Sequence, residues 1–188
     1  MAESLRGHIL IASVGLRDPN FFKTVVLMVE HGDKGAMGLV VNRPSKVSVQ
    51  QALEKHFALP ETDECVHIGG PVEQNALFIL HNLAQFDGGE EPLLPGLFVG
   101  HSAEVFHDVV EKVAEGQLSV HFRVFAGCAG WAPDQLEGEL ARGDWHVRPA
   151  SGDIIFQADP YSLWDSQFRK VREEHRLFPD LSGNPELN

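Results

Sequence analysis

The chain has 188 residues, of which 43% are hydrophobic and 22% are charged. A chain of this length and composition is expected to form one folded domain with its own core, without a metal or disulfide to stabilise it. The 27 acidic residues outnumber the 15 basic ones and give a formal net charge of −12. This balance argues against a protein that neutralises nucleic-acid phosphates over a wide face.

No stretch approaches the roughly 18 apolar residues needed to span a bilayer. The apolar run at 9–16 follows Arg6 but lacks a small-residue cleavage site, so it does not read as a signal peptide. Cys65 and Cys128 lie far apart and lack zinc-type spacing, which favours small core residues in a reducing compartment, although a disulfide between them stays open. We expect a cytoplasmic protein with no membrane association.

The first third of the chain predicts three strands, at 8–14, 24–30 and 38–42, each rich in Val, Ile and Leu. Turn sequences join them: Asp-Pro-Asn at 18–20, and Gly-Asp-Lys-Gly at 32–35, which predicts a tight hairpin. Because these connections are too short for helical crossovers, much of the sheet should be antiparallel or mixed.

Helix signals come next. Ser48 and Gln51 form a capping-box pattern for a helix that ends at Pro60, and strands at 65–68 and 76–81 flank the Gly-Gly-Pro turn at 69–71. A loop is predicted at 82–95. Ser102 caps a helix over 103–115 that stops at Gly116.

The last third begins with a strand at 118–125, whose alternating pattern predicts one solvent-exposed face, followed by a glycine-rich segment at 127–131. A short helix at 133–142, strands at 145–147 and 154–156, and a final helix capped by Asp159 complete the pattern. In the final helix Trp164, Phe168 and Val171 should face inward. We therefore predict an α/β, α+β-like single domain over 1–178, with a mixed, largely antiparallel sheet packed by four or more helices, and a flexible tail at 179–188.

Familiar catalytic patterns are missing from the sequence. It contains no Walker A loop, no Gly-x-Gly-x-x-Gly after a strand, no His-Glu-x-x-His and no Gly-x-Ser-x-Gly elbow. The Gly-Gly-Pro turn at 69–71 cannot cradle phosphate, because its proline removes a backbone donor. Cys128 and Ser102, which follows His101, are the candidate nucleophiles, but Ser102 is better explained as a helix cap.

Ten histidines raise the question of a metal site. Glu30, His31, His67, His81 and His101 all fall at predicted strand ends, where side chains from different strands converge. None has ligand spacing, and Glu30 and His31 should point to opposite faces of a strand. We predict no metal and no cofactor.

Polar and aromatic residues gather where the apolar strands end, and each also has a structural use in an Asx turn, a salt bridge or a helix first turn. Together they predict a binding surface with no catalytic residue. Its members are Asp18, Asn20, Phe21, Glu30, His31, Asn42, Arg43, Gly69, Gly70, Trp131, Gln135 and Glu137.

Taken together, these segments resemble the AlgH/YqgE family of bacterial proteins over Leu5 to Trp164. The resemblance rests on the order and spacing of six segments, none of which encodes a mechanism by itself. They are Gly-His-Ile-Leu-Ile-Ala at 7–12, Asp-Pro-Asn-Phe at 18–21, the run at 24–31, the run from Gly35 to Pro44, Gly-Gly-Pro-Val at 69–72, and the run from Gly127 to Leu140.

The resemblance implies an α/β fold with a mixed sheet packed by helices, and a role in transcriptional regulation that carries no catalytic residue. Two positions depart from the family pattern: Cys128 stands where members usually carry tyrosine, and His101 stands where a second glycine is common. A role for a phenol at the first position therefore does not transfer to this chain.

Three functions follow as hypotheses. The first is a non-enzymatic regulatory or interaction module that holds an unidentified protein or small molecule, in an oligomeric state that the sequence does not predict. The second is an enzyme, such as a hydrolase, in which Glu30, His31 and His81 converge in a cleft and Arg43 clamps an anion. The third, direct binding of nucleic acid, conflicts with the acidic charge and with helices that are separated by strands.

Overall fold

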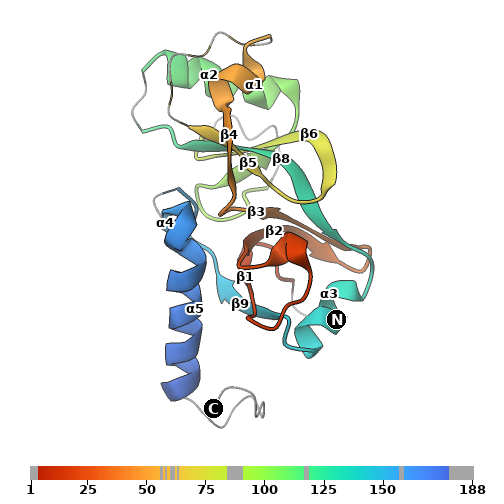
Figure 1. The fold of residues 1–188 in the computed structure, drawn as a ribbon. Coiled ribbons are helices and arrows are strands. Elements are labelled where there is room, and N and C mark those ends of the chain that lie inside the picture. Colours follow the sequence, from red (N-terminus) through yellow and green to blue (C-terminus); the bar gives the residue numbers. More distant parts are fainter. Residues whose placement is uncertain are drawn as a thin grey trace.

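The computed structural model describes residues 4–55, 57, 59, 62, 64–83, 91–116, 119–156 and 159–177. The tail predicted at 179–188 lies outside the described residues. Figure 1 shows the arrangement, in which the long strand β8 (Phe122–Trp131) runs from one half of the molecule into the other.

In the part of the chain that the structure describes, eight further strands join β8 in one mixed sheet. Along its main path the order is β4-β5-β8-β3-β2-β1-β9, and β6 pairs with both β8 and β7. Among the described strands only the β5–β8 pair is parallel, so the prediction of a mixed, largely antiparallel sheet is confirmed. The other strands are β1 (His8–Ala12), β2 (Val25–Gly32), β3 (Gly35–Val40), β4 (Pro44–Ser48), β5 (Cys65–Ile68), β6 (Val72–His81), β7 (Phe98–Gly100) and β9 (Trp145–Pro149).

The described helices pack at two ends of this sheet. In Figure 1, α1 (Val49–Leu53) and α2 (Ala103–Ala114) lie over β4, β5, β6 and β8 at the top. The lower half holds β1, β2, β3 and β9, with α3 (Gln135–Ala141) and the long α5 (Pro160–Leu177) beside them, and α4 (Gly152–Phe156) above α5. None of the described helices is both long and apolar enough to cross a bilayer.

Each half has its own apolar cluster. The larger surrounds β1, β2 and β3 and includes Trp131, Trp145 and Trp164. The smaller lies under α1 and α2 and includes Phe106 and Phe122. Because β8 contributes to both clusters, it ties the two halves into one fold.

Local signals in the sequence account for several helix and turn boundaries. The capping box at Ser48 forms as predicted, with its hydroxyl accepting from Gln51 N–H at 3.1 Å. Ser102 caps α2 through Val105 N–H, and Asp159 accepts N–H bonds at the start of α5. The β2–β3 hairpin also closes as predicted, with Gly32 opposite Gly35.

Gly69 and Gly70, predicted as part of the binding surface, have a packing role at the β5–β6 turn. A Cβ on Gly69 would lie 2.1 Å from the carbonyl oxygen of Gly127, and one on Gly70 would lie 2.2 Å from the backbone of Cys128. This close approach leaves no room for a side chain. The turn sits against the middle of β8, where the two halves meet.

Three element predictions are wrong. Residues 154–156, predicted as a strand, belong to the short helix α4, because a brief apolar run does not distinguish a buried helix turn from a strand. The strand predicted to end at Phe125 continues as β8 to Trp131, where the lack of a side chain on Gly127 admits the β5–β6 turn. The strand face expected in solvent is closed at Arg123 and Phe125, which are buried like Phe122 and Val124 on the other face, whereas His121, directly before β8, is exposed.

Two strands lie where none was predicted, β4 directly before α1 and β7 directly before α2. β4 contains a proline and exposed residues, as is common at a sheet edge. The helix predicted from Ser48 to Pro60 is shorter, because α1 ends at Leu53.

Candidate functional site

The carboxylate of Glu139, on α3, holds two tryptophan rings in place. Its Oε2 accepts the indole N–H of Trp131 at 2.9 Å and that of Trp145 at 2.8 Å. Its Oε1 accepts from the side-chain amide of Gln135 at 3.0 Å. Since Trp131 ends β8 and Trp145 begins β9, this one carboxylate links a helix to two strands.

Phe21 adds a third aromatic ring from the short 3-10 helix η1 (Pro19–Phe21). It stacks on Trp131 with ring centroids 6.1 Å apart and meets Trp145 edge-on at 5.5 Å. Both tryptophans are buried, whereas Phe21 is half-buried. The cluster therefore presents part of one aromatic ring to solvent above a closed aromatic floor.

A pocket of about 490 Å³ lies over these rings and is open to solvent on one side. This volume is in the range that holds a small ligand or a side chain of a partner. On its rim Arg142 pairs with Asp144 at 2.8 Å, and Arg17 and Asp18 are exposed. We call it the aromatic pocket; it is lined by Gly15, Leu16, Arg17, Asp18, Phe21, Trp131, Gln135, Glu139, Arg142, Asp144 and Trp145.

Asn42 fixes the end of the loop that carries Phe21. Its Oδ1 accepts the backbone N–H of Val25 at 2.8 Å, and its Nδ2 donates to the carbonyl of Lys23 at 2.9 Å. This residue, predicted as part of the binding surface, does not line the pocket. It positions the loop that forms one wall.

Arg43, Asp18 and Asn20 support the same loop. The Arg43 guanidinium donates to the carbonyl of Asn20 and, at 3.3 Å, to that of Phe22. Asp18 accepts from Asn20 N–H at 2.8 Å in an Asx turn. Burial lowers the pKa of Arg43, and the nearby charge of Asp18 opposes the shift. Arg43 is thus engaged with backbone oxygens rather than poised to clamp an anion.

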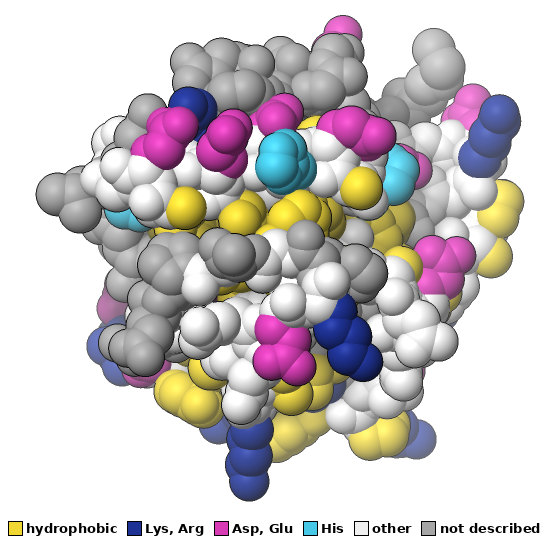
Figure 2. Space-filling model, turned by 90° about the horizontal axis from the view of Figure 1, so that it is seen from above, with side chains coloured by type: hydrophobic (Ala, Val, Ile, Leu, Met, Phe, Trp, Pro, Cys, Tyr) yellow, Lys and Arg dark blue, Asp and Glu magenta, His cyan; other side chains and the backbone are white. Residues whose placement is uncertain are grey.

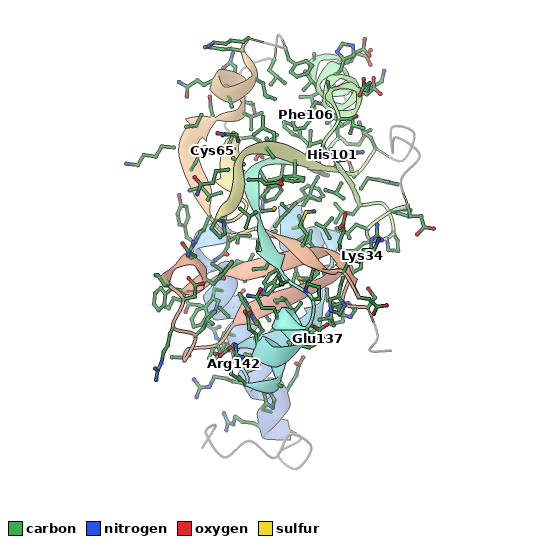
Figure 3. All side chains as sticks on the ribbon, turned by 90° about the vertical axis from the view of Figure 1, so that its right-hand side faces the viewer. Lys34, Cys65, His101, Phe106, Glu137 and Arg142 are labelled. Carbon is green, nitrogen blue, oxygen red and sulfur yellow. The ribbon has the colours of Figure 1, made fainter. Side chains whose placement is uncertain are left out.

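His31 and Glu137 meet in a separate contact on the other side of α3. His31 Nδ1 accepts the backbone N–H of Leu5 at 3.0 Å, so its Nε2 carries the proton and donates to Glu137 at 2.9 Å. The pKa of Glu137 is lowered by its own backbone N–H and then by His31. Figure 3 shows Glu137 and Arg142 on opposite sides of α3, with Glu137 toward the hairpin that carries Lys34.

The catalytic arrangement considered from the sequence does not form. His31 pairs with Ala36, which lies opposite Trp131 at one end of β8, whereas His81 lies opposite Phe122 at the other end. Nine residues of strand span about 30 Å, so these groups cannot act on one substrate atom. Glu30 is exposed on β2 and His81 is buried on β6. The hypothesis of convergence in one cleft is wrong.

The cysteines and the candidate metal ligands are not arranged for chemistry in the described residues. Burial raises the pKa of the Cys128 thiol, with added effects from Glu73 and Glu30, and this disfavours the thiolate. The structure does not join Cys65 to Cys128 in a disulfide. Within the described residues, no three His, Cys, Asp or Glu side chains gather in a way that could hold a metal ion.

Four residues of the predicted binding surface line the aromatic pocket: Asp18, Phe21, Trp131 and Gln135. Glu139 and Trp145 also line it but were not predicted from the sequence. The available signal was the spacing of Gln135 and Glu139, four residues apart on a helix that directly follows Trp131. From the sequence alone, a single glutamate on a short helix is expected to be a solvent-exposed charge. Only the tertiary fold shows that two indole N–H groups donate to it.

Known proteins resemble this chain over nearly its whole length. It matches the AlgH-like family over residues 9–176. A UPF0301 protein of Chlorobium luteolum is 34% identical over 182 residues, covering 97% of this chain and 94% of its own. Another, of Cereibacter sphaeroides, is 35% identical over 184 residues, covering 96% and 98%.

Solved structures agree with these matches. The solution structure of the AlgH protein from Pseudomonas aeruginosa has a TM-score of 0.70 and 32% identity, covering 98% of this chain and 100% of that one. A crystal structure of a Corynebacterium diphtheriae protein has a TM-score of 0.71 at 24% identity, covering 90% and 88%, and supports the fold alone.

Fold and pocket together define a mixed α/β domain with an aromatic, carboxylate-braced surface pocket. The chain belongs to the AlgH-like family, as the resemblance in its sequence implied.

Proposed function

We propose that this protein is a non-enzymatic interaction module that regulates by binding a protein segment or small molecule in the aromatic pocket. The observation that carries the proposal is the bracing of Trp131 and Trp145 by one carboxylate, which holds the floor rigid while Phe21 and the rim stay accessible. Rigid aromatic side chains in a preformed pocket are typical anchors for partners, because little conformational entropy is lost on binding.

The regulatory role is proposed to be indirect and cytoplasmic. A role in transcription is suggested by family resemblance, but the formal charge of −12 opposes contact with phosphates. A partner protein bound in the pocket would connect the module to regulation without such contact.

The experiment fills the pocket without removing any of its contacts. Gly15 lines the pocket, its φ is not in the left-handed region, and a Cβ there would meet only Ser13 Oγ at 4.0 Å. Gly15→Trp should therefore fold normally and occupy the binding space. Gly152→Trp is the matched control, because a Cβ on Gly152 has nothing within 4 Å and Gly152 does not line the pocket.

Affinity capture from bacterial lysate, quantified by mass spectrometry, compares the two variants with the unmodified protein. We expect Gly15→Trp to lose partners that Gly152→Trp and the unmodified protein retain. Equal retention of every partner by both variants would show that the pocket is not the docking site.

A further inference from the structure

A second surface, far from the aromatic pocket, runs along α2. Four carboxylates recur at helical spacing here: Glu104, Asp108 and Glu111 on α2, and Glu115 at its C-cap. Lys112 is the one Lys or Arg between positions 104 and 115 and bonds to Glu115 at 2.7 Å. Its pKa is raised first by Glu115 and then also by Glu111 and Asp108. The row therefore keeps a net negative charge of about three after this pairing.

An apolar hollow lies beside this acidic row. Figure 2, which views the molecule from the side of α1 and α2, shows acidic side chains and histidine along α2 and a hydrophobic band next to them. On this side of the fold Ala52, Phe57 and Val113 are half-buried and pack on the smaller core cluster. Phe57 stacks on exposed His107 with ring centroids 6.2 Å apart. We call the acidic row and the band together the α2 groove.

The charge of the α2 groove selects its occupant. An anionic membrane surface would be repelled by the acidic row. A symmetric contact with a second copy would bring the two acidic rows together, and their like charges would repel. The basic helix α5 of a second copy is not a suitable occupant either. Its apolar face, with Trp164 and Val171, is already buried in its own core.

We propose that the α2 groove binds a basic amphipathic helix of a partner protein. The apolar stripe of that helix lies on the hydrophobic band, and its Lys or Arg side chains pair with the carboxylates of α2. The 12 residues of α2 extend for about 18 Å, so they match a segment of about three helical turns. This surface is independent of the aromatic pocket, since the two lie in different halves of the fold.

The test uses a synthetic 14-residue probe of Leu and Lys arranged with helical periodicity, labelled for fluorescence anisotropy at about 150 mM salt. The full-length protein is compared with its Asp108→Lys/Glu111→Lys variant. Both positions lie on α2 outside its buried face, so circular dichroism should show an unchanged fold. The variant loses two carboxylates that attract Lys side chains of the probe and gains two Lys side chains that repel them. Binding of the probe should therefore weaken about tenfold.

Two controls separate a groove from plain charge attraction. Asp153→Lys/Glu173→Lys makes the same change in net charge at exposed sites on α4 and α5 and should bind the probe with unchanged affinity, while a scrambled peptide of the same composition should bind at least tenfold more weakly. The proposal is overturned if the probe does not bind at about 100 μM, if the scrambled peptide binds equally, or if both variants weaken alike. A dimer of the unmodified protein that Asp108→Lys/Glu111→Lys dissociates would overturn it in favour of a second copy.

Discussion

Trp131 and Trp145 donate their indole N–H groups to the same oxygen of Glu139, at 2.9 and 2.8 Å. Their rings meet edge-on with centroids 6.1 Å apart, and Phe21 packs against both. Because the two rings come from strands separated in the sequence by α3, the carboxylate fixes both the floor of the pocket and the position of the helix.

Removal of this carboxylate should destabilise the fold. Glu139→Leu leaves two buried indole donors without an acceptor and should lower the free energy of unfolding by about 3–5 kcal/mol. Glu139→Gln keeps a neutral acceptor and should cost about 1–2 kcal/mol. Urea unfolding followed by circular dichroism measures both. If Glu139→Leu were as stable as the unmodified protein, the bracing role of Glu139 would be refuted.

The sequence was informative about this site only where a residue type carries its own signal. Phe21 and Trp131 stand out beside turns and glycines, and Asp18 is an ordinary Asx-turn residue. Glu139 gives no such signal, because its function depends on two indoles brought from β8 and β9 by tertiary packing. The same limit explains α4, whose short apolar run fits a strand or a helix until Ile155 is seen to pack into the core.

Capping and turn chemistry, by contrast, was predicted residue by residue. Ser48 with Gln51, Ser102 and Asp159 act as caps because their hydrogen bonds are local and need no distant partner. The long-range pairing of β4, β5 and β6 around β8 has no comparable local signal, since it depends on which strands meet in three dimensions.

Stability should fall with acid because of His67. Burial first, and then the charge of Arg123, lowers the pKa of this imidazole from 6.5 to about 4. The unfolded chain therefore binds a proton below pH 6.5 that the folded protein does not take up until about pH 4. Stability from this group is fully present above pH 6.5 and is lost as the pH falls toward 4, by about 3 kcal/mol.

His67→Phe tests this account. In the unmodified protein the His67 and Phe125 ring centroids lie 5.5 Å apart. The substitution keeps an aromatic ring in this contact and removes the titrating group. Urea unfolding at several pH values should give a flatter dependence between pH 6.5 and 4. The slope that remains should come in part from His146, whose pKa is also lowered by burial and then by His175. An unchanged slope in His67→Phe would mean that other groups carry the acid sensitivity.

Asp134 stands in the left-handed region, with φ of +61°, directly before α3. Its side chain makes no capping hydrogen bond there that would offset the backbone strain. Asp134→Gly should raise the free energy of unfolding by about 1 kcal/mol. Gly116→Ala is the converse control: at φ of +75° and with open space around it, it should destabilise by a similar amount. A destabilised Asp134→Gly would contradict the assignment of strain.

Direct binding of DNA should be absent. With a formal charge of −12, the protein should give no shift of duplex DNA in a retardation assay at micromolar protein and about 150 mM salt. A discrete, salt-sensitive shift at those concentrations would contradict the proposal of indirect regulation.

The aromatic pocket is tested most directly by the indole N–H resonances of the three tryptophans. Trp131 and Trp145 report on the pocket, while Trp164 donates to the carbonyl of Ala12 at 2.8 Å and serves as the internal control. Protein labelled with ¹⁵N at tryptophan should show shifted Trp131 and Trp145 resonances, and an unshifted Trp164 resonance, when a captured partner is added. Binding of that partner with no change at Trp131 or Trp145 would contradict the account.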